Sequence, residues 1–417
     1  MKTSKLSFYL YIMSVFLIPL SPATKLILGM ENLTWVDPSL ILCMLGVIIL
    51  IMTDQIKVYQ RSYLILSIMT FILIYFIGAL INGSRLESIS VGEIIREPLK
   101  LLLCLCMTYL TYVFTNQNED RVTIFYYFGT GAILQFCFAV YLILAYYLNL
   151  PLLPPMKEYI VDYVGRQSLW ITPPIPRLGG TFIESPPFGL YMLVVLFCAT
   201  LFYKYSKNIF ALVVIIIGLL GAVFSLADQI LVALLVSFCL IFISLEKVRK
   251  SFFMPVLVVY AAVLVAVVTI LVMPHFQNKI EEISNINQSS VGERTFHILF
   301  SLKMLFNDIL TFLIGLGPGL YGKYATTTGY YPDTVTPQVT IIEILVETGV
   351  LGFAIFACLL VLTLRRMLRL HSMYGIAVFV GLFLAIAAQA TWKWSSVFFL
   401  IPFVLSFKTQ LEPTNLE

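Results

Sequence analysis

The chain has 417 residues, of which 60% are hydrophobic and 12% charged, and its mean hydropathy is +0.96. This composition excludes an ordinary soluble domain, and the net charge of +4 gives no reason to expect a nucleic-acid partner. The apolar runs are continuous over about 20 residues instead of alternating, which predicts membrane-spanning helices and not an outer-membrane barrel. We therefore expect an all-α, polytopic integral membrane helix bundle that forms a single domain over 1–417.

Twelve spans are predicted in chain order. They are 6–22, 38–53, 63–82, 98–115, 122–149, 186–203, 208–226, 229–245, 252–273, 338–364, 372–390 and 394–409. Basic residues gather in alternate loops, including clusters at 247–250 and 365–369, and the positive-inside rule places these loops in the cytoplasm. Both termini are therefore expected to be cytoplasmic, with the first span retained and not cleaved as a signal peptide.

Two long loops are predicted on the outer side, 150–185 and 274–337, the larger one lying between the ninth and tenth spans. The first is rich in proline, which fixes the backbone, and the second is rich in glycine, which permits tight turns. Together they are expected to cap a site at the outer membrane interface. The apolar segment 296–314 within the second loop predicts a helix packed on the outer face of the bundle or partly re-entrant.

The motif RLGGTFIESPPFG at 177–189 opens the sixth span. The planar guanidinium of Arg177 suits two phosphate oxygens, and Gly179 and Gly180 leave room for a ligand near the backbone. Glu184 lies near the apolar span, where desolvation would raise its pKa toward that of a general base. An Arg177–Glu184 ion pair that only anchors the loop is the alternative.

Two further basic groups are candidates for binding an anion. Arg294, in VGERTF at 291–296, faces either a phosphate or a neighbouring acid such as Glu293. Arg96 and Lys100 lie one helical turn apart where the fourth span begins, and either bind an anion or extend toward the membrane interface.

The glycine run GLGPG at 315–319 is followed by tyrosines whose flat rings suit stacking on sugars, although tyrosines also anchor proteins at membrane interfaces. The residues predicted to contact glycan are Tyr321, Tyr324, Tyr330 and Gln338. The three histidines, His275, His297 and His371, are expected to be solvated and uninvolved. Without CxxC or HExxH patterns, neither a metal nor another cofactor is predicted.

Glu343 and Glu347 lie four residues apart in QVTIIEILVETGVLG at 338–352, so they share one face of the tenth span. Two carboxylates on an inward face would repel, so one is expected to be protonated or paired with a basic residue. For Glu347, polar packing between helices and a functional role are equally open.

These motifs, in this order, resemble the O-antigen polymerase and ligase superfamily of bacterial membrane proteins, most strongly over 177–352. The resemblance implies transfer of glycans from undecaprenyl diphosphate at the outer face of the bacterial inner membrane. It also implies that Arg177 and Arg294 face the diphosphate, that Glu184 is the acid of the polymerase branch, and that Glu347 begins the E-x-G-x-x-G pattern. The implied partners are undecaprenyl-diphosphate-linked glycans, the lipid bilayer and a chain-length regulator protein.

Two departures from the family bear on the activity. Ligases of this family usually carry a histidine where this chain has Gln338, which favours polymerisation of repeat units over transfer of finished glycan to another acceptor. A Ser-Arg pair common in the family is replaced by Ala227 and Asp228, and Asp228 has no predicted role.

A flippase is a further alternative, but the charges gather toward one face and no internal repeat is evident. Glu184 is the first candidate for the general base and Glu347 the second.

Overall fold

The computed structural model describes residues 5–21, 37–54, 63–83, 91–115, 118–151, 177–182, 185–244, 290–322, 324, 339–387 and 395–406. Within these ranges the regular elements are all helices and no strand occurs, which confirms the all-α prediction for this part of the chain. The elements are α1 (Lys5–Leu17), η1 (Ile18–Leu20), α3 (Pro38–Met52), α4 (Tyr63–Gly83), α5 (Val91–Thr115), α6 (Asn118–Leu148), α8 (Ser185–Ser206), α9 (Ile209–Phe224), α10 (Asp228–Ser244), α12 (Ser290–Leu305), α13 (Ile309–Ile314), α15 (Thr340–Ala387) and α16 (Ser395–Leu405). The predicted span 252–273 lies outside the described residues.

Four described segments are long and apolar enough to cross a membrane, judged by length and composition. They are Ile94–Thr115, Asp120–Leu148, Ser185–Ser206 and Thr340–Arg369. The other apolar helices are shorter, and many large hydrophobic side chains on their outer faces are exposed, as expected where hydrocarbon replaces water. The fold is that of a helical membrane protein, whereas the count of twelve crossings and the orientation remain predictions.

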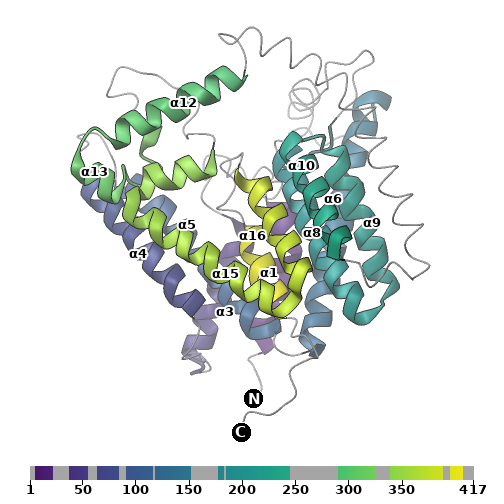
Figure 1. The fold of residues 1–417 in the computed structure, drawn as a ribbon. Coiled ribbons are helices and arrows are strands. Elements are labelled where there is room, and N and C mark those ends of the chain that lie inside the picture. The colour runs from purple at the N-terminus through teal and green to yellow at the C-terminus, as the bar shows by residue number, and fades with distance from the viewer. Residues whose placement is uncertain are drawn as a thin grey trace.

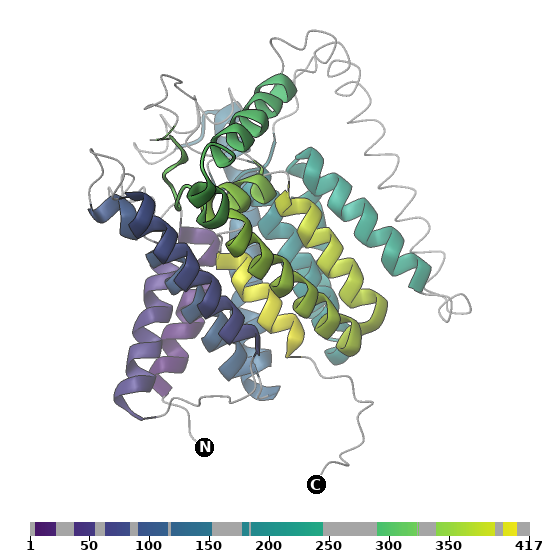
Figure 2. The ribbon, with the colours of Figure 1, turned by 60° about the vertical axis from the view of Figure 1, so that its left-hand side comes forward.

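The helices form two groups with α15 and α16 between them. Helices α1, α3, α4 and α5 lie on one side of the bundle, and α8, α9 and α10 lie on the other (Figures 1 and 2). Helix α6 packs against α1, α8 and α9, and thereby joins the two groups. Helix α15 contacts α4 and α10, while α16 contacts α5 and α8. Helix α8 is buried along most of its length.

Helix α15 changes direction twice. Gly349 has a φ of +64°, outside the helical range, and breaks the helix after its first turns. Further along, the ribbon runs down the bundle and turns back beside itself (Figure 2). An ideal Cβ on Gly375 would lie 2.5 Å from the carbonyl oxygen of Met367, which reflects this tight turn. The predicted spans 338–364 and 372–390 therefore correspond to two limbs of one element.

The apolar segment 296–314 forms two helices, where the sequence predicted one. The first helix ends at Leu305, and Asp308 caps the second helix. The Asp308 carboxylate accepts from the Thr311 amide at 2.8 Å and from the Thr311 hydroxyl at 2.6 Å. Helix α12 contacts α15 and α13 and lies across one end of the bundle (Figures 1 and 2). The sequence predicted a helix packed against the outer face of the bundle or partly re-entrant. Packing against the bundle agrees with the first form, and the assignment of this end to the outer side stays a prediction.

Candidate functional site

The loop that carries Arg177 is fixed by hydrogen bonds to three elements. The amide of Leu178 donates to the carbonyl oxygen of Phe224 at the end of α9, at 2.9 Å. The hydroxyl of Thr181 contacts the side-chain Oε1 of Gln135 in α6 at 3.1 Å and the backbone carbonyl oxygen of Pro19 in η1. Arg177 is therefore followed directly by a segment that is anchored to the helices around it.

Arg177 is half-buried beside Asp228, the first residue of α10. Burial lowers the pKa of the Arg177 guanidinium from its usual value, and the charge of Asp228 acts in the opposite direction. An arginine keeps its proton in such surroundings, so the site retains a positive charge next to a carboxylate. Sequence reasoning gave Asp228 no role because 51 positions separate it from Arg177 and only the fold brings them together.

Glu347 is buried and lies at a junction of three elements. Its Oε2 accepts from the Tyr75 hydroxyl of α4 at 2.6 Å, and its Oε1 accepts from the Gly319 amide at 2.8 Å. Both carboxylate oxygens therefore hold neighbouring elements in place. Glu343, one turn earlier on α15, is also buried, in agreement with the predicted inward face.

The glycine run 315–319 is also bound to α15 through its backbone. The amide of Leu316 donates to the Val346 carbonyl oxygen at 2.7 Å, and the amide of Gly317 donates to the Glu347 carbonyl oxygen at 3.1 Å. The break at Gly349 leaves these two carbonyls available to partners outside the helix. The glycine run therefore joins its backbone to that of α15.

Glu347→Ala should lower thermal stability because the buried Tyr75 hydroxyl and Gly319 amide would lose their acceptor. An unsatisfied buried donor costs about 1–3 kcal/mol. Thermal unfolding of the detergent-solubilised protein measures the loss. Glu347→Gln is the control, since its amide retains an oxygen for Gly319 and an NH₂ group that can donate to Tyr75. An equal loss in both variants would show that the charge, and not the hydrogen-bond geometry, stabilises this junction.

The prediction that Tyr321 stacks on glycan is wrong for this structure. The Tyr321 side chain is 1% exposed, its hydroxyl lies 3.3 Å from His297 Nδ1, and its ring packs edge-on against Phe300. Both faces are thus taken up by protein. Tyr324 packs against the same cluster, which contains Met304. Tyr330 and Gln338, the other two glycan candidates, lie outside the described residues, as does Glu184.

The prediction that His297 is solvated is also wrong, because it lies in α12 and is 1% exposed. A signal was present in the sequence: His297, Ser301 and Met304 recur at helical spacing and form one buried face. His297 was instead taken as an isolated loop residue. The backbone of Arg294, the predicted diphosphate arginine, lies one turn earlier in α12.

The charged end of α5 adjoins the glycine run. The Arg96 Nε lies 3.3 Å from Glu97 Oε1, and an ideal Cβ on Gly319 would lie 3.1 Å from Glu97 Cγ. Lys100, also half-buried, follows one turn below Arg96. The candidate anion pair Arg96 and Lys100 is therefore close to the Glu347 junction, with Glu97 as a neighbour that sequence reasoning missed.

The predicted residues thus fall into two groups at one end of the bundle. Arg177 lies near the start of α10, while Arg96, Glu347 and the glycine run meet where α4, α5 and α15 converge. Both views place α12 and the starts of α10 and α15 at this end (Figures 1 and 2). Within the described ranges, no three His, Cys, Asp or Glu side chains converge as a metal site would require.

Comparison of the chain with protein-family models and with curated protein sequences finds no match.

Proposed function

We propose that this protein is a glycosyltransferase that polymerises undecaprenyl-diphosphate-linked repeat units into O-antigen or capsular polysaccharide. In this proposal the bundle crosses the bacterial inner membrane twelve times, both termini are cytoplasmic, and the site faces the periplasm or exterior. The supporting observation is that Arg177 is presented, half-buried, from an anchored loop at the same end of the bundle as the Glu347 junction.

The chemistry follows from the charges. The hydroxyl oxygen of the acceptor sugar forms a bond to the anomeric carbon of the donor, and the bond from that carbon to the diphosphate oxygen breaks. Negative charge grows on the departing diphosphate, where preplaced guanidinium groups of Arg177 and Arg294 would stabilise it. The proton of the acceptor hydroxyl passes to a base, for which Glu184 is the first candidate. The contacts of Glu347 favour a positioning role, since both its oxygens already accept hydrogen bonds.

The direct test is incubation of the purified protein with lipid-linked repeat units, followed by separation of the products on a gel. A ladder of multi-repeat products supports polymerisation. Transfer of preformed glycan to a different acceptor, without a ladder, would instead indicate a ligase. Movement of the lipid-linked unit across a proteoliposome membrane without formation of new bonds would indicate a flippase.

Asp228→Asn should slow polymer formation by less than about fivefold, the range expected for a partly exposed charge pair. In this proposal the negative charge of Asp228, which raises the pKa of the Arg177 guanidinium, helps to orient it, and asparagine retains the size but not the charge. The rate of ladder formation measures the effect, with Gln229→Ala on the same helix as the control for local disturbance. A loss as large as that of Arg177→Ala would contradict an orienting role and indicate direct contact with substrate.

A further inference from the structure

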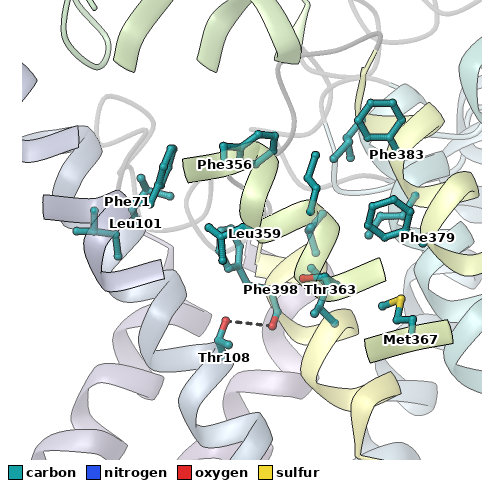
Figure 3. A pocket seen from close by; sticks show the side chains of 16 residues that line it. Phe71, Leu101, Thr108, Phe356, Leu359, Thr363, Met367, Phe379, Phe383 and Phe398 are labelled. Atoms are coloured by element: carbon teal, nitrogen blue, oxygen red, sulfur yellow. Dashed lines mark hydrogen bonds between the residues drawn. The ribbon is translucent and has the colours of Figure 1, made fainter. Parts of the chain in front are cut away.

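An apolar cavity lies below the Glu347 junction, between α4, α5, both limbs of α15, and α16 (Figure 3). It has a volume of about 980 Å³, including the part open to the outside. Phenylalanines from four helical segments line it: Phe71, Phe356, Phe379, Phe383 and Phe398. The cavity exists because α15 turns back on itself and brings its two limbs to one space.

The cavity offers almost nothing for water to bind. Its polar side chains are Thr108 and Thr363, and the Thr108 hydroxyl is already bonded to the carbonyl oxygens of Cys104 at 3.1 Å and Phe398 at 3.3 Å. An ordered water requires two to four polar partners, and apolar cavities of this kind accept hydrocarbon. The occupant that fits this lining is therefore a hydrocarbon chain.

Two helices that line the cavity also carry residues at the charged end of the bundle. On α4, Phe71 lies one turn from Tyr75, the partner of Glu347, with ring centroids 5.9 Å apart. Phe71 also contacts Phe356 of α15, at 6.0 Å between ring centroids. On α5, the lining residue Leu101 directly follows Lys100. Both helices thus change from polar to apolar within about one turn, which suits a ligand with a charged head and an apolar tail.

We propose that this cavity binds the polyprenyl tail of a lipid-linked substrate, with the attached diphosphate near Arg96 and Lys100. This inference rests on the proposed function. A bulk phospholipid gains little by moving its tails from the bilayer into an equally apolar cavity, because no hydrophobic driving force separates the two environments. Occupancy must therefore be directed by the head group, and a diphosphate offers two anionic groups to the basic pair.

The first test uses the wild-type protein in nanodiscs of phosphatidylethanolamine and phosphatidylglycerol. The probe is a polyprenyl diphosphate without glycan that carries a photoreactive diazirine in its tail. We expect labelled peptides from 356–367 and 379–386, with labelling suppressed by unlabelled polyprenyl diphosphate but not by additional phosphatidylglycerol. Equal suppression by both lipids, or labelling confined to the outer faces of the helices, would overturn the proposal.

The second test compares two variants of α15. Leu359 lines the cavity and is 9% exposed, whereas Val361 is 64% exposed on the same limb. Leu359→Trp should reduce labelling of the cavity peptides roughly tenfold by occupying the space, as overpacking does in apolar sites. Val361→Trp should leave labelling nearly unchanged. Equal labelling of the two variants would contradict binding in the cavity.

The two proposals can fail separately. Cavity labelling by the glycan-free probe in a protein that forms no polymer would support the tail site and reject the polymerase. A normal product ladder without cavity labelling would reject the tail site alone. The wild-type labelling does not depend on whether a tryptophan variant folds.

Discussion

Arg177→Ala should leave the protein inserted in the membrane while cells make only single-repeat glycans. Loss of one preplaced donor to a developing negative charge typically lowers the rate by about 10²–10³-fold. Arg294→Ala should have a similar effect, because the resemblance assigns both arginines to the diphosphate. Glycan length on a gel measures the result, and the amount of protein in the membrane fraction checks insertion.

Two further variants separate the specific role of Arg177 from bulk charge. Arg177→Lys should not fully restore long chains, because an ammonium cannot make the forked contact of a guanidinium. Arg121→Ala removes another half-buried arginine, whose Nε donates to the Thr115 carbonyl oxygen, and should leave chain length normal. Long chains at normal levels in both Arg177→Ala and Arg294→Ala would reject the assigned roles.

Gly349→Ala should cause the largest loss of stability among single substitutions considered for this protein. A Cβ at this position would lie 2.4 Å from the Leu313 carbonyl oxygen and 2.5 Å from the Gly315 amide nitrogen. The positive φ alone costs roughly 1–2 kcal/mol for a residue with a side chain, and separating two backbones adds to it. We expect a large drop in thermal unfolding temperature, or failure to accumulate in the membrane.

Gly319→Ala is the matched control for the backbone conformation. Its φ of +69° is nearly the same, but its ideal Cβ meets only the flexible Glu97 side chain, at 3.1 Å. The free energy of unfolding of this variant should fall only by the amount that a positive φ costs a residue with a side chain. Equal destabilisation of the two variants would show that backbone conformation, and not the close contact of α15 with residues 313–315, determines the effect.

Hydropathy predicted the positions of the described helices because a continuous apolar segment in hydrocarbon satisfies its backbone hydrogen bonds by forming a helix. The predicted spans 38–53 and 208–226, for example, match α3 and α9 within about two residues at each end. Asp308 also had a readable capping signal, which was overlooked inside the apolar run 296–314.

The contacts that build the candidate site were not predictable in the same way. The pairing of the Leu316 amide with the Val346 carbonyl joins residues 30 positions apart, and hydropathy carries no information about such partners. The proximity of Asp228 to Arg177 likewise depends on the hydrogen bond between Leu178 and Phe224. The roles of Glu184, Tyr330 and Gln338 stay predictions, since these residues lie outside the described ranges.

The contact between Gly315 and Gly349 limits which residues can occupy these two positions during evolution. A side chain at either position would clash with the backbone around the other glycine. Neither residue can therefore be substituted without a change in the surrounding structure. Distant homologues should therefore keep both glycines. A pair of glycines at these two positions would help to identify homologues of this protein. Apolar sequence alone does not, because polytopic membrane proteins share it in general.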